Sequence, residues 1–158
     1  MPAQLSAGLL MYRGSGRDTE VLLVHPGGPF WAKKDEGAWS IPKGIPDKDE
    51  DLLAAARREF HEETGFTAEG EFKPLGAHKQ PGGKTVHAWA VEGDCDPAKL
   101  VSNLFEMEWP SRLGKRARFP EIDRAGWFGA EEALTKILPG QRPIVLKLFE
   151  ILGFPRPS

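Results

Sequence analysis

The 158-residue sequence predicts an α/β fold in which helices pack on a mixed β-sheet. Short apolar runs bounded by turn residues alternate with segments of helical periodicity, which indicates strands and helices in one chain. The 18 glycines and 14 prolines predict many turns and argue against a helical bundle. The length and the 40% apolar content suit one core, so we expect residues 1–158 to form a single domain.

The chain is predicted to begin with a β-hairpin. Residues 7–12 and 21–25 are short apolar runs, and a turn cluster at residues 13–18 separates them. A loop rich in glycine and proline follows at residues 26–37. Residues 39–41 are then expected to form a third short strand, which the proline at position 42 ends.

Residues 49–64 are predicted to form a helix, because they contain neither glycine nor proline and include three consecutive alanines. Asp47 or Asp49 can cap its N-terminus, and Gly65 follows its end, where a left-handed residue belongs. On a helical wheel the apolar side chains form one stripe that should face the core. This stripe comprises Leu52, Leu53, Ala56 and Phe60.

After this helix the sequence predicts four strands and two further helices. The strands are expected at residues 71–75, 85–91, 104–109 and 125–128. The helices are expected at residues 130–137 and 143–152, the second with apolar residues at helical spacing. Residues 79–84 carry a strong turn signal between the first two strands, and residues 110–120 are expected to be a basic loop.

Charge and cysteine content exclude several classes of protein. The formal net charge of −2 gives no general attraction to nucleic acid or to an anionic membrane. No apolar run approaches the roughly 18 residues that a membrane-spanning helix needs. Cys95 is the single cysteine, so no internal disulfide can form, and we expect a reducing, cytoplasmic compartment. Acidic neighbours disfavour the Cys95 thiolate, so we expect no catalytic role for it.

Three glutamates lie along the edge of the predicted core stripe of the helix. Glu59, Glu62 and Glu63 stand at positions i, i+3 and i+4, so their carboxylates are neighbours and repel one another. The acidity is local, since residues 44–66 hold seven acidic and three basic residues while the rest of the chain holds 16 and 18. A divalent cation would turn this repulsion into attraction, and oxygen donors suit Mg²⁺ or Mn²⁺. A solvated acidic face is the alternative interpretation.

The same region also spells a longer pattern. Gly44, Glu50 and the run REFHEETGF at residues 58–66 match G-x5-E-x7-R-E-U-x-E-E-x-G-U, in which U is apolar. Every fixed position is filled, and the sequence therefore resembles the Nudix hydrolase family. The order of predicted elements extends the resemblance to nearly the whole chain. It implies an α/β/α sandwich with a mixed central β-sheet, in which the pattern forms a loop–helix–loop beside the sheet.

The resemblance implies hydrolysis of a diphosphate linkage in a nucleoside diphosphate joined to another group, with Mg²⁺ or Mn²⁺ as cofactor. By position, Glu62 and Glu63 resemble metal ligands, and Glu59 resembles a further ligand or the base that activates water. The backbone carbonyl of Lys43, just before the pattern, would be another ligand.

Other positions of the pattern resemble structural residues. Arg58 and Glu50 resemble an ion pair that braces the helix against the preceding loop, and Arg58 is counted with the catalytic group. Gly44 and Gly65 resemble turn residues that take no part in the chemistry.

Related proteins often recruit one more glutamate from outside the pattern. The candidates are Glu106, Glu108 and Glu121. Glu121 is favoured as a metal ligand or base, because a glutamate six residues ahead of a strand tryptophan, here Trp127, resembles the extra ligand of some relatives.

The sequence leaves the substrate open between several nucleotides. Residues 39–44 resemble the approach to the pattern in diadenosine-polyphosphate hydrolases, but the tyrosine that marks this subgroup is absent from residues 82–84. Pro81 resembles an ADP-ribose hydrolase marker, although a simple turn also explains it. A nucleoside triphosphate or dinucleoside polyphosphate is favoured. An ADP-ribose or nucleotide-sugar pyrophosphatase and a catalytically silent nucleotide sensor are the alternatives.

Several basic residues could cradle a polyphosphate chain. They are Lys79, Lys84, Arg112, Lys115, Arg116 and Arg118. Solvated loops are the alternative for all of them. No basic stripe suggests an extended nucleic-acid footprint, so the expected partner is a small nucleotide. Trp31, Trp89 and Trp109 could stack on a base, although a strand tryptophan usually belongs to the core.

Overall fold

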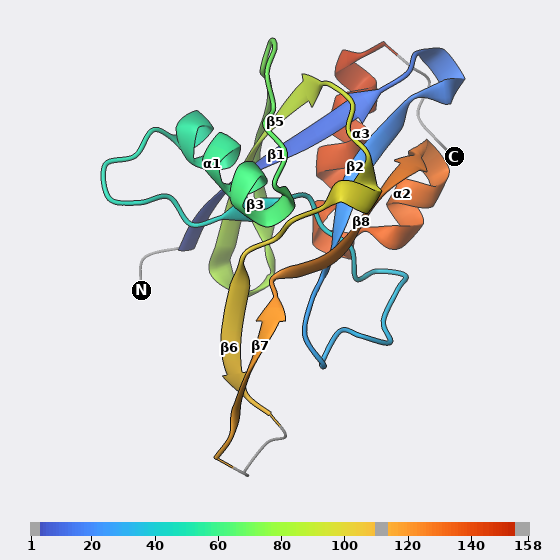
Figure 1. Cartoon of the computed structure of the whole chain (residues 1–158). Helices are drawn as coiled ribbons and strands as arrows, with labels where there is room; N and C mark the ends of the chain where they lie inside the picture. Colours follow the sequence, from blue (N-terminus) through green and yellow to red (C-terminus); the bar gives the residue numbers. More distant parts are fainter. Residues whose placement is uncertain (1–3, 110–113, 154–158) are drawn as a thin grey trace.

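The computed structural model describes residues 4–109 and 114–153, and a mixed sheet with the strand order β4-β5-β1-β2-β8 forms its centre (Figure 1). Its strands are β1 (Gln4–Arg13), β2 (Glu20–Pro26), β4 (Lys73–Gln80), β5 (Lys84–Glu92) and β8 (Ile122–Gly129), with β3 (Lys43–Gly44) paired to β1. β1 and β5 run parallel, and the other strand pairs in the described part of the sheet are antiparallel. This arrangement confirms the predicted mixed sheet.

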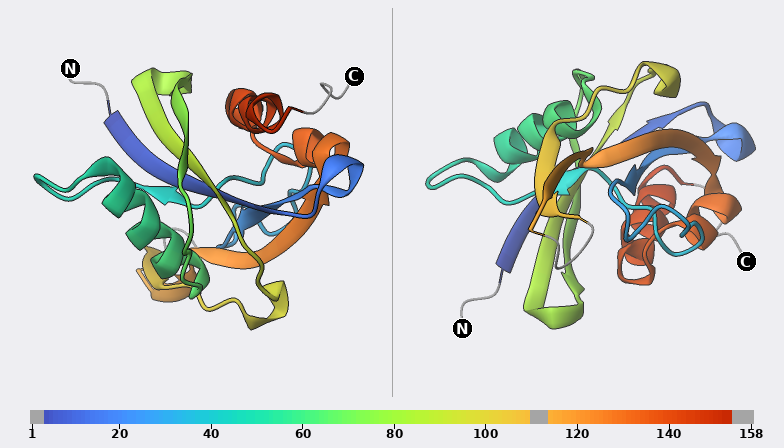
Figure 2. Two further views of the ribbon diagram at one scale, coloured as in Figure 1. Left: turned by 90° about the horizontal axis from the view of Figure 1, so that it is seen from above. Right: turned by 60° about the horizontal axis from the view of Figure 1, so that its bottom comes forward.

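Helices cover both faces of the sheet (Figure 2). Helix α1 (Leu52–Thr64) packs on one face with Leu9 and Leu22. Helices α2 (Ala130–Lys136) and α3 (Arg142–Ile151) pack on the other face with Leu10 and Leu23. Successive residues of a strand point to opposite faces, and here helices cover both faces, so residues 7–12 of β1 and 21–24 of β2 are buried on both sides and form apolar runs. The predicted α/β/α sandwich is confirmed.

Two more strands form a separate antiparallel ribbon, which we call the β6–β7 arm. Strands β6 (Leu104–Glu108) and β7 (Arg116–Pro120) pair along their whole length, and the arm projects from the body of the molecule (Figure 1). The prediction of a loop over residues 110–120 is wrong for its second half, because cross-strand pairing with β6 organises residues 116–120. Residues 110–113, and with them Arg112, lie outside the described residues.

Helix α1 begins later than predicted. Its N-cap is Asp51, whose carboxylate accepts a hydrogen bond from the backbone N–H of Ala54 at 3.1 Å. Neither Asp47 nor Asp49 caps the helix, and Asp49 instead has a positive φ of 64° in the preceding turn. Gly65 ends the helix with φ 79°, as predicted, in a conformation that favours glycine.

The buried stripe of α1 is rotated from the predicted one. Ala55, Ala56, Phe60, Glu63 and Thr64 are buried. Leu52 and Leu53 are only half-buried, contrary to the prediction. The small side chains of the two alanines let the helix lie close against the sheet, and this contact turns Glu63 inward.

The remaining elements are present as predicted, but β4 extends five residues beyond its predicted end, to Gln80, and β8 begins three residues early, at Ile122. The first hairpin pairs Tyr12 with Val21, and the two C-terminal helices lie within one or two residues of their expected bounds. Residues 39–41 form only isolated bridges, because the N–H of Ile41 donates to the Oε1 atom of Gln141 instead of to a strand. No helix among the described residues is long and apolar enough to cross a membrane.

Candidate active site

The three glutamates of α1 differ in burial, although they share one edge of the helix. Glu63 is only 8% exposed. The side chain of Glu59 is 13% exposed and that of Glu62 is 40% exposed. The carboxyl groups therefore run from the protein interior to solvent within a single helical turn. A carboxylate that is partly removed from water interacts more strongly with neighbouring charges.

Glu63 has the most perturbed carboxyl group of the site. Burial, followed by repulsion from Glu59 and Glu121, raises its pKa to about 8, while the backbone and the ammonium group of Lys43 act in the opposite direction. A carboxyl group with this pKa is mostly protonated at neutral pH unless a cation stabilises its charge. Burial also raises the pKa of Glu59, against the hydrogen bond from Arg58.

Glu121 lies at the junction between β7 and β8, close to the glutamates of the Nudix-like pattern on α1. Burial raises its pKa, and Glu59 and Glu62 raise it further, so these carboxyl groups lie close enough to repel. Its backbone is fixed on both sides, because its N–H donates to Asn103 and its carbonyl accepts from Gly27, each at 2.8 Å. The structure thus brings the favoured extra glutamate to the predicted ligands.

The two alternative glutamates lie elsewhere, on the β6–β7 arm. Glu106 is exposed and lies 3.7 Å from Arg118, and Glu108 stands opposite Arg116 in the strand register.

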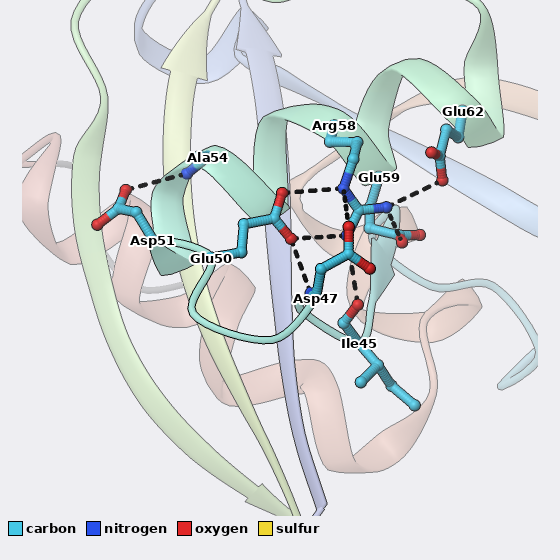
Figure 3. A network of polar contacts seen from close by, with 8 residues as sticks. All are labelled: Ile45, Asp47, Glu50, Asp51, Ala54, Arg58, Glu59 and Glu62. Carbon is cyan, nitrogen blue, oxygen red and sulfur yellow. Dashed lines mark hydrogen bonds and ion pairs between the residues drawn. The ribbon is translucent and has the colours of Figure 1, made fainter.

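Arg58 connects the helix to the preceding loop (Figure 3). Its guanidinium donates two hydrogen bonds to Glu50, at 2.9 and 2.8 Å, and one to the carbonyl of Ile45 at 3.3 Å. It also donates to Glu59 at 2.8 Å and to Glu62 at 3.2 Å. The hydrogen bonds from Arg58 lower the pKa of the Glu50 carboxyl group to about 2. The predicted ion pair is present, and Arg58 additionally binds two of the predicted metal ligands.

Gly44 has a different role from the predicted one. Its φ is not positive, and it lies in β3, so it is not a turn residue. A Cβ atom at this position would lie 2.0 Å from a carboxylate oxygen of Glu59. Any larger residue would therefore displace the Glu59 carboxylate, which packs directly against the Gly44 backbone.

The donor set suits a hard divalent cation in its chemistry. The carboxyl groups of Glu59, Glu62, Glu63 and Glu121 are close enough for pairs of them to repel, and this repulsion contributes to the raised pKa values among them. Within residues 4–109 and 114–153, however, no three acidic, histidine or cysteine side chains are arranged as a metal site. Arg58 pairs with Glu59 and Glu62, through one oxygen of each carboxylate.

A cavity of ≈ 210 Å³ opens beside Glu63, and we call it the Glu63 pocket. Its apolar walls come from Val24, Pro26, Trp31, Ala38, Ile41, Ile122 and Leu138, and its polar lining from Ser40, Lys43 and Glu63. Burial lowers the pKa of the Lys43 ammonium group, and the charge of Glu63 partly offsets this lowering. Sequence reasoning singled out Trp31 as a base-stacking candidate but missed Ile122 and Leu138, which carry no local signal of a binding role.

The predicted phosphate-binding residues are not gathered in one place. Lys84, at the start of β5, lies close enough to Lys43 to lower its pKa. Lys79 is exposed on β4. Arg116 and Arg118 are exposed on the β6–β7 arm.

Arg116 and Arg118 lie on the face of the β6–β7 arm that points away from the loop after β2, which borders the Glu63 pocket. Because alternate strand residues point to opposite sides, Arg116 and Arg118 share the face opposite to Phe105 and Phe119. The ring of Phe105 packs near Gly28 in the loop that borders the Glu63 pocket. Of Lys79, Lys84, Arg116 and Arg118, Lys84 is the one that acts on Lys43, a residue of the pocket lining.

Cys95 lies apart from this site. Burial, together with Asp94, raises the pKa of its thiol to about 11. This agrees with the expectation that it forms no reactive thiolate.

Comparison with known proteins identifies the family. Residues 2–148 match the family model described as NUDIX domain. The chain belongs to the Nudix family. Nudix domains among solved structures share its fold. The NUDIX domain of Shewanella oneidensis NrtR, complexed with ADP ribose, has a TM-score of 0.68 and 15% identity, covering 96% of this chain and 90% of that one. The Caenorhabditis elegans Ap4A hydrolase has a TM-score of 0.61 and 24% identity, covering 94% and 97%.

Curated relatives match shorter parts of this Nudix chain. The mRNA-decapping protein g5R of African swine fever virus is 34% identical over 98 residues, which cover 59% of this chain and 37% of the viral protein. The phosphatase NudJ of Escherichia coli is 28% identical over 120 residues, covering 73% and 70%. The RNA pyrophosphohydrolase of Caulobacter vibrioides is 45% identical over 53 residues, covering 30% and 31%. The match thus spans little more than a third of the viral decapping proteins.

Proposed function

We propose that this Nudix protein is a metal-dependent pyrophosphohydrolase that cleaves a diphosphate linkage in a nucleotide. The observation that carries the proposal is the buried carboxyl group of Glu63 at the wall of a cavity, with Glu59 and Glu121 close enough to raise its pKa further. A perturbed acidic group beside a pocket is typical of a catalytic site. The names of the relatives, which include an RNA pyrophosphohydrolase and an Ap4A hydrolase, support this class of reaction.

Mg²⁺ or Mn²⁺ would be held by Glu59, Glu62, Glu63, Glu121 and the backbone carbonyl of Lys43. Nudix family members generally use divalent metal ions of this kind. When bound, such an ion neutralises charge on the phosphate oxygens and lowers the pKa of a water molecule. Arg58 binds one oxygen of Glu59, Oε1, and one oxygen of Glu62, Oε2, so each carboxylate keeps a second oxygen that can face an ion.

The chain itself supplies the other requirements of the reaction. Glu59 or Glu121 is positioned to accept a proton from attacking water, since neither carboxyl group is fully buried. Lys43, beside Glu63, and Lys84, close to Lys43, provide positive charge for phosphate oxygens. Trp31 and the aliphatic walls of the Glu63 pocket exclude water from bound substrate. The favoured substrates are a nucleoside triphosphate or a dinucleoside polyphosphate.

A hydrolysis screen tests this proposal. The purified protein is incubated with ATP, diadenosine tetraphosphate, ADP-ribose and a nucleotide sugar, each with Mg²⁺, with Mn²⁺ and with EDTA. We expect metal-dependent release of nucleoside phosphate from at least one of the first two compounds, and no release with EDTA. Nucleotide binding without any turnover would indicate a silent sensor instead, and preferential cleavage of ADP-ribose or the nucleotide sugar would overturn the favoured substrate class.

A further inference from the structure

One serine in the lining of the Glu63 pocket takes no part in the proposed chemistry. Ser40 contributes an uncharged hydroxyl group to this lining, whereas Lys43 and Glu63 contribute charged groups. The backbone of Ser40 is fixed, because its N–H and its carbonyl each form a hydrogen bond of 2.9 Å with Val24 of β2. The direction in which its hydroxyl group bonds is therefore set by the partners of the side chain.

The side chain of Ser40 is held by Gln141, which is fully buried and directly precedes α3. The Oε1 atom of Gln141 accepts a hydrogen bond from the N–H of Ile41 at 3.0 Å. Because a backbone N–H only donates, this bond fixes which end of the amide faces Ile41. The Nε2 atom then donates to Oγ of Ser40 at 3.0 Å. The N–H of Gln141 also donates to the carbonyl of Leu138 at 2.8 Å, so Gln141 bonds three residues that line the pocket.

These contacts leave the Ser40 hydroxyl group as a hydrogen-bond acceptor. A hydroxyl group has one proton and two lone pairs. The acceptors within reach of its proton are protein atoms, the carbonyl oxygen of Ile41 at 2.7 Å and Oε1 of Gln141 at 3.3 Å. Gln141 occupies one lone pair and, within residues 4–109 and 114–153, is the one donor that bonds this oxygen. A ligand that meets the second lone pair therefore has to carry an N–H or O–H group.

The size and the walls of the pocket suit a single flat ring system. Its volume of ≈ 210 Å³ is below that of pockets for drug-sized ligands, about 300–1,000 Å³. The indole of Trp31 and the aliphatic side chains of the other walls favour an aromatic group over a phosphate. Lys43 and Glu63 in the same lining suit the phosphates and the cation of a nucleotide. A purine with an exocyclic amino group combines a flat ring with the donor that Ser40 requires.

We propose that the Glu63 pocket binds an amino-bearing purine whose exocyclic N–H donates to Oγ of Ser40. Gln141 is the positioning residue that holds this oxygen as an acceptor, and Ser40 selects the base without touching the phosphate that reacts. The inference deepens the proposed function by naming the base of the substrate, and it rests on that function only in taking the ligand to be a nucleotide.

Nucleoside monophosphates test the proposal without turnover, because they contain no diphosphate linkage. Two pairs differ by one amino group each, namely AMP with purine riboside 5′-monophosphate, and GMP with IMP. Each compound is titrated into ¹⁵N-labelled protein, and the amide chemical shifts report both the dissociation constant and the place of binding. In the wild-type protein we expect shifts at residues 38–41. In at least one pair the amino compound should bind about fivefold more tightly, which is the contribution of one neutral hydrogen bond.

Two variants assign this preference to the Ser40 hydroxyl group. In Ser40→Ala the acceptor is lost, so the amino compound should bind only as tightly as its partner, whose dissociation constant should change less than about twofold. In Gln141→Met the hydroxyl group is free to turn its proton toward the ligand, so the preference should fall below about twofold. A merely structural role of Gln141 would weaken both members of a pair equally and leave their ratio unchanged.

Thr19→Val is the matched control, because it also removes one buried hydroxyl group. Thr19 lies in the turn before β2, where its hydroxyl group donates to the carbonyl of Gly16 at 2.9 Å. We expect this variant to keep the wild-type preference within each pair. The wild-type titrations need no variant, and they decide the proposal if neither Ser40→Ala nor Gln141→Met folds.

Three results would overturn the proposal. The first is equal binding within both pairs by the wild-type protein, and the second is an absence of shifts at residues 38–41. The third is a preference for the amino compound that survives in a folded Ser40→Ala protein. None of the three depends on hydrolysis. A protein that selects the amino compound but cleaves no diphosphate linkage would overturn the proposed function alone, and a hydrolase without this selectivity would overturn the present inference alone.

Discussion

Glu62 and Glu63 are adjacent in the sequence and carry the same carboxyl group, but their surroundings give them different properties. Glu63 is buried by the packing of α1 on the sheet, and its pKa rises to about 8. The side chain of Glu62 is 40% exposed, and it forms an ion pair with Arg58 one helical turn earlier. A cation near Glu63 would recover the charge stabilisation that burial removes, so Glu63 has more to gain from metal binding than its neighbour.

Replacing Glu63 with glutamine tests this role. We expect Glu63→Gln to lower turnover at least about 100-fold, because the amide cannot stabilise charge at a metal. Without metal, the thermal unfolding temperature should stay level or rise, since glutamine is neutral like the protonated Glu63 and removes the cost of ionising a buried carboxyl group beside Glu59 and Glu121. Addition of Mg²⁺ should raise that temperature in the wild-type protein and less in the variant. Full activity of Glu63→Gln with Mg²⁺ would rule out a metal site at this glutamate.

A second prediction at this scale concerns Gly44. In Gly44→Ala the new methyl group would overlap the Glu59 carboxylate, whose oxygen lies 2.0 Å from the Cβ position, so Glu59 has to move. We expect activity to fall at least about tenfold, while the free energy of unfolding drops by less than about 1 kcal/mol, because the atoms that have to move are the end of a flexible side chain. Gly129→Ala is the matched control, since nothing lies within 4 Å of its Cβ position and its φ of −68° suits alanine. Equal activities of the two variants would contradict the close packing of Glu59 on Gly44.

Helix α1 and the loop before it are joined chiefly through Arg58. The guanidinium bonds Glu50 and the Ile45 carbonyl in the loop and Glu59 in the helix, so one side chain fixes both elements (Figure 3). The two hydrogen bonds from Arg58 to Glu50 fix the relative orientation of the two side chains as well as stabilising the contact. The loop leads directly from Lys43 and Gly44, which pair with β1, so Arg58 joins the helix to the segment that follows the Lys43 carbonyl.

We expect Arg58→Ala to reduce both folding stability and activity. The free energy of unfolding should fall by about 1–3 kcal/mol, because the variant leaves partly buried carboxylates without their donor. Arg57→Ala is the matched control, since Arg57 is exposed and rests on the ring of Phe72, and it should cost under about 1 kcal/mol. Thermal unfolding and initial rates measure both effects. An Arg58→Ala protein with unchanged stability and sharply reduced catalysis would show that Arg58 contacts substrate instead of bracing the loop.

The sequence predicts the secondary-structure elements better than it predicts the packing contacts between them. The periodicity of apolar residues and the positions of turn residues were enough to predict the hairpin, α1 and its end at Gly65, and the position of Glu121 before a strand. The N-cap at Asp51, the burial of Glu63 and the role of Gly44 depend on how closely α1 packs against the sheet and β3. Tertiary packing sets these features, and it can differ from what helical periodicity and local capping preference alone predict.

At the scale of the whole molecule, the Glu63 pocket is assembled from segments far apart in the chain. Trp31 comes from the long loop after β2, Ile122 from β8 and Leu138 from the turn after α2. Each is an ordinary apolar residue in its local sequence, so only the completed fold reveals a shared role. The polar end of the pocket, in contrast, contains residues of the Nudix pattern and its immediate approach, which a linear motif can identify.

The distribution of basic residues leads to a prediction about phosphate recognition. Lys84 lies near Lys43 at the polar end of the pocket, whereas Arg116 and Arg118 share the arm face opposite to Phe105. We expect Lys84→Gln to raise KM several-fold for diadenosine tetraphosphate and much less for ADP-ribose, with kcat largely intact, because uniform binding is lost. The double variant Arg116→Gln/Arg118→Gln is the comparison, and its KM should change less than about twofold.

Salt provides an independent check of this assignment. Lys84 is exposed, so the difference in KM between Lys84→Gln and the wild-type protein should shrink as ionic strength rises and its charge is screened. If the arm variant instead raises KM for diadenosine tetraphosphate more than Lys84→Gln does, the arm bends over the substrate and its arginines hold the polyphosphate, as their sequence clustering first suggested. If neither variant responds to the number of phosphates, the positive charge that binds the chain of phosphates comes from Lys43 and the metal alone.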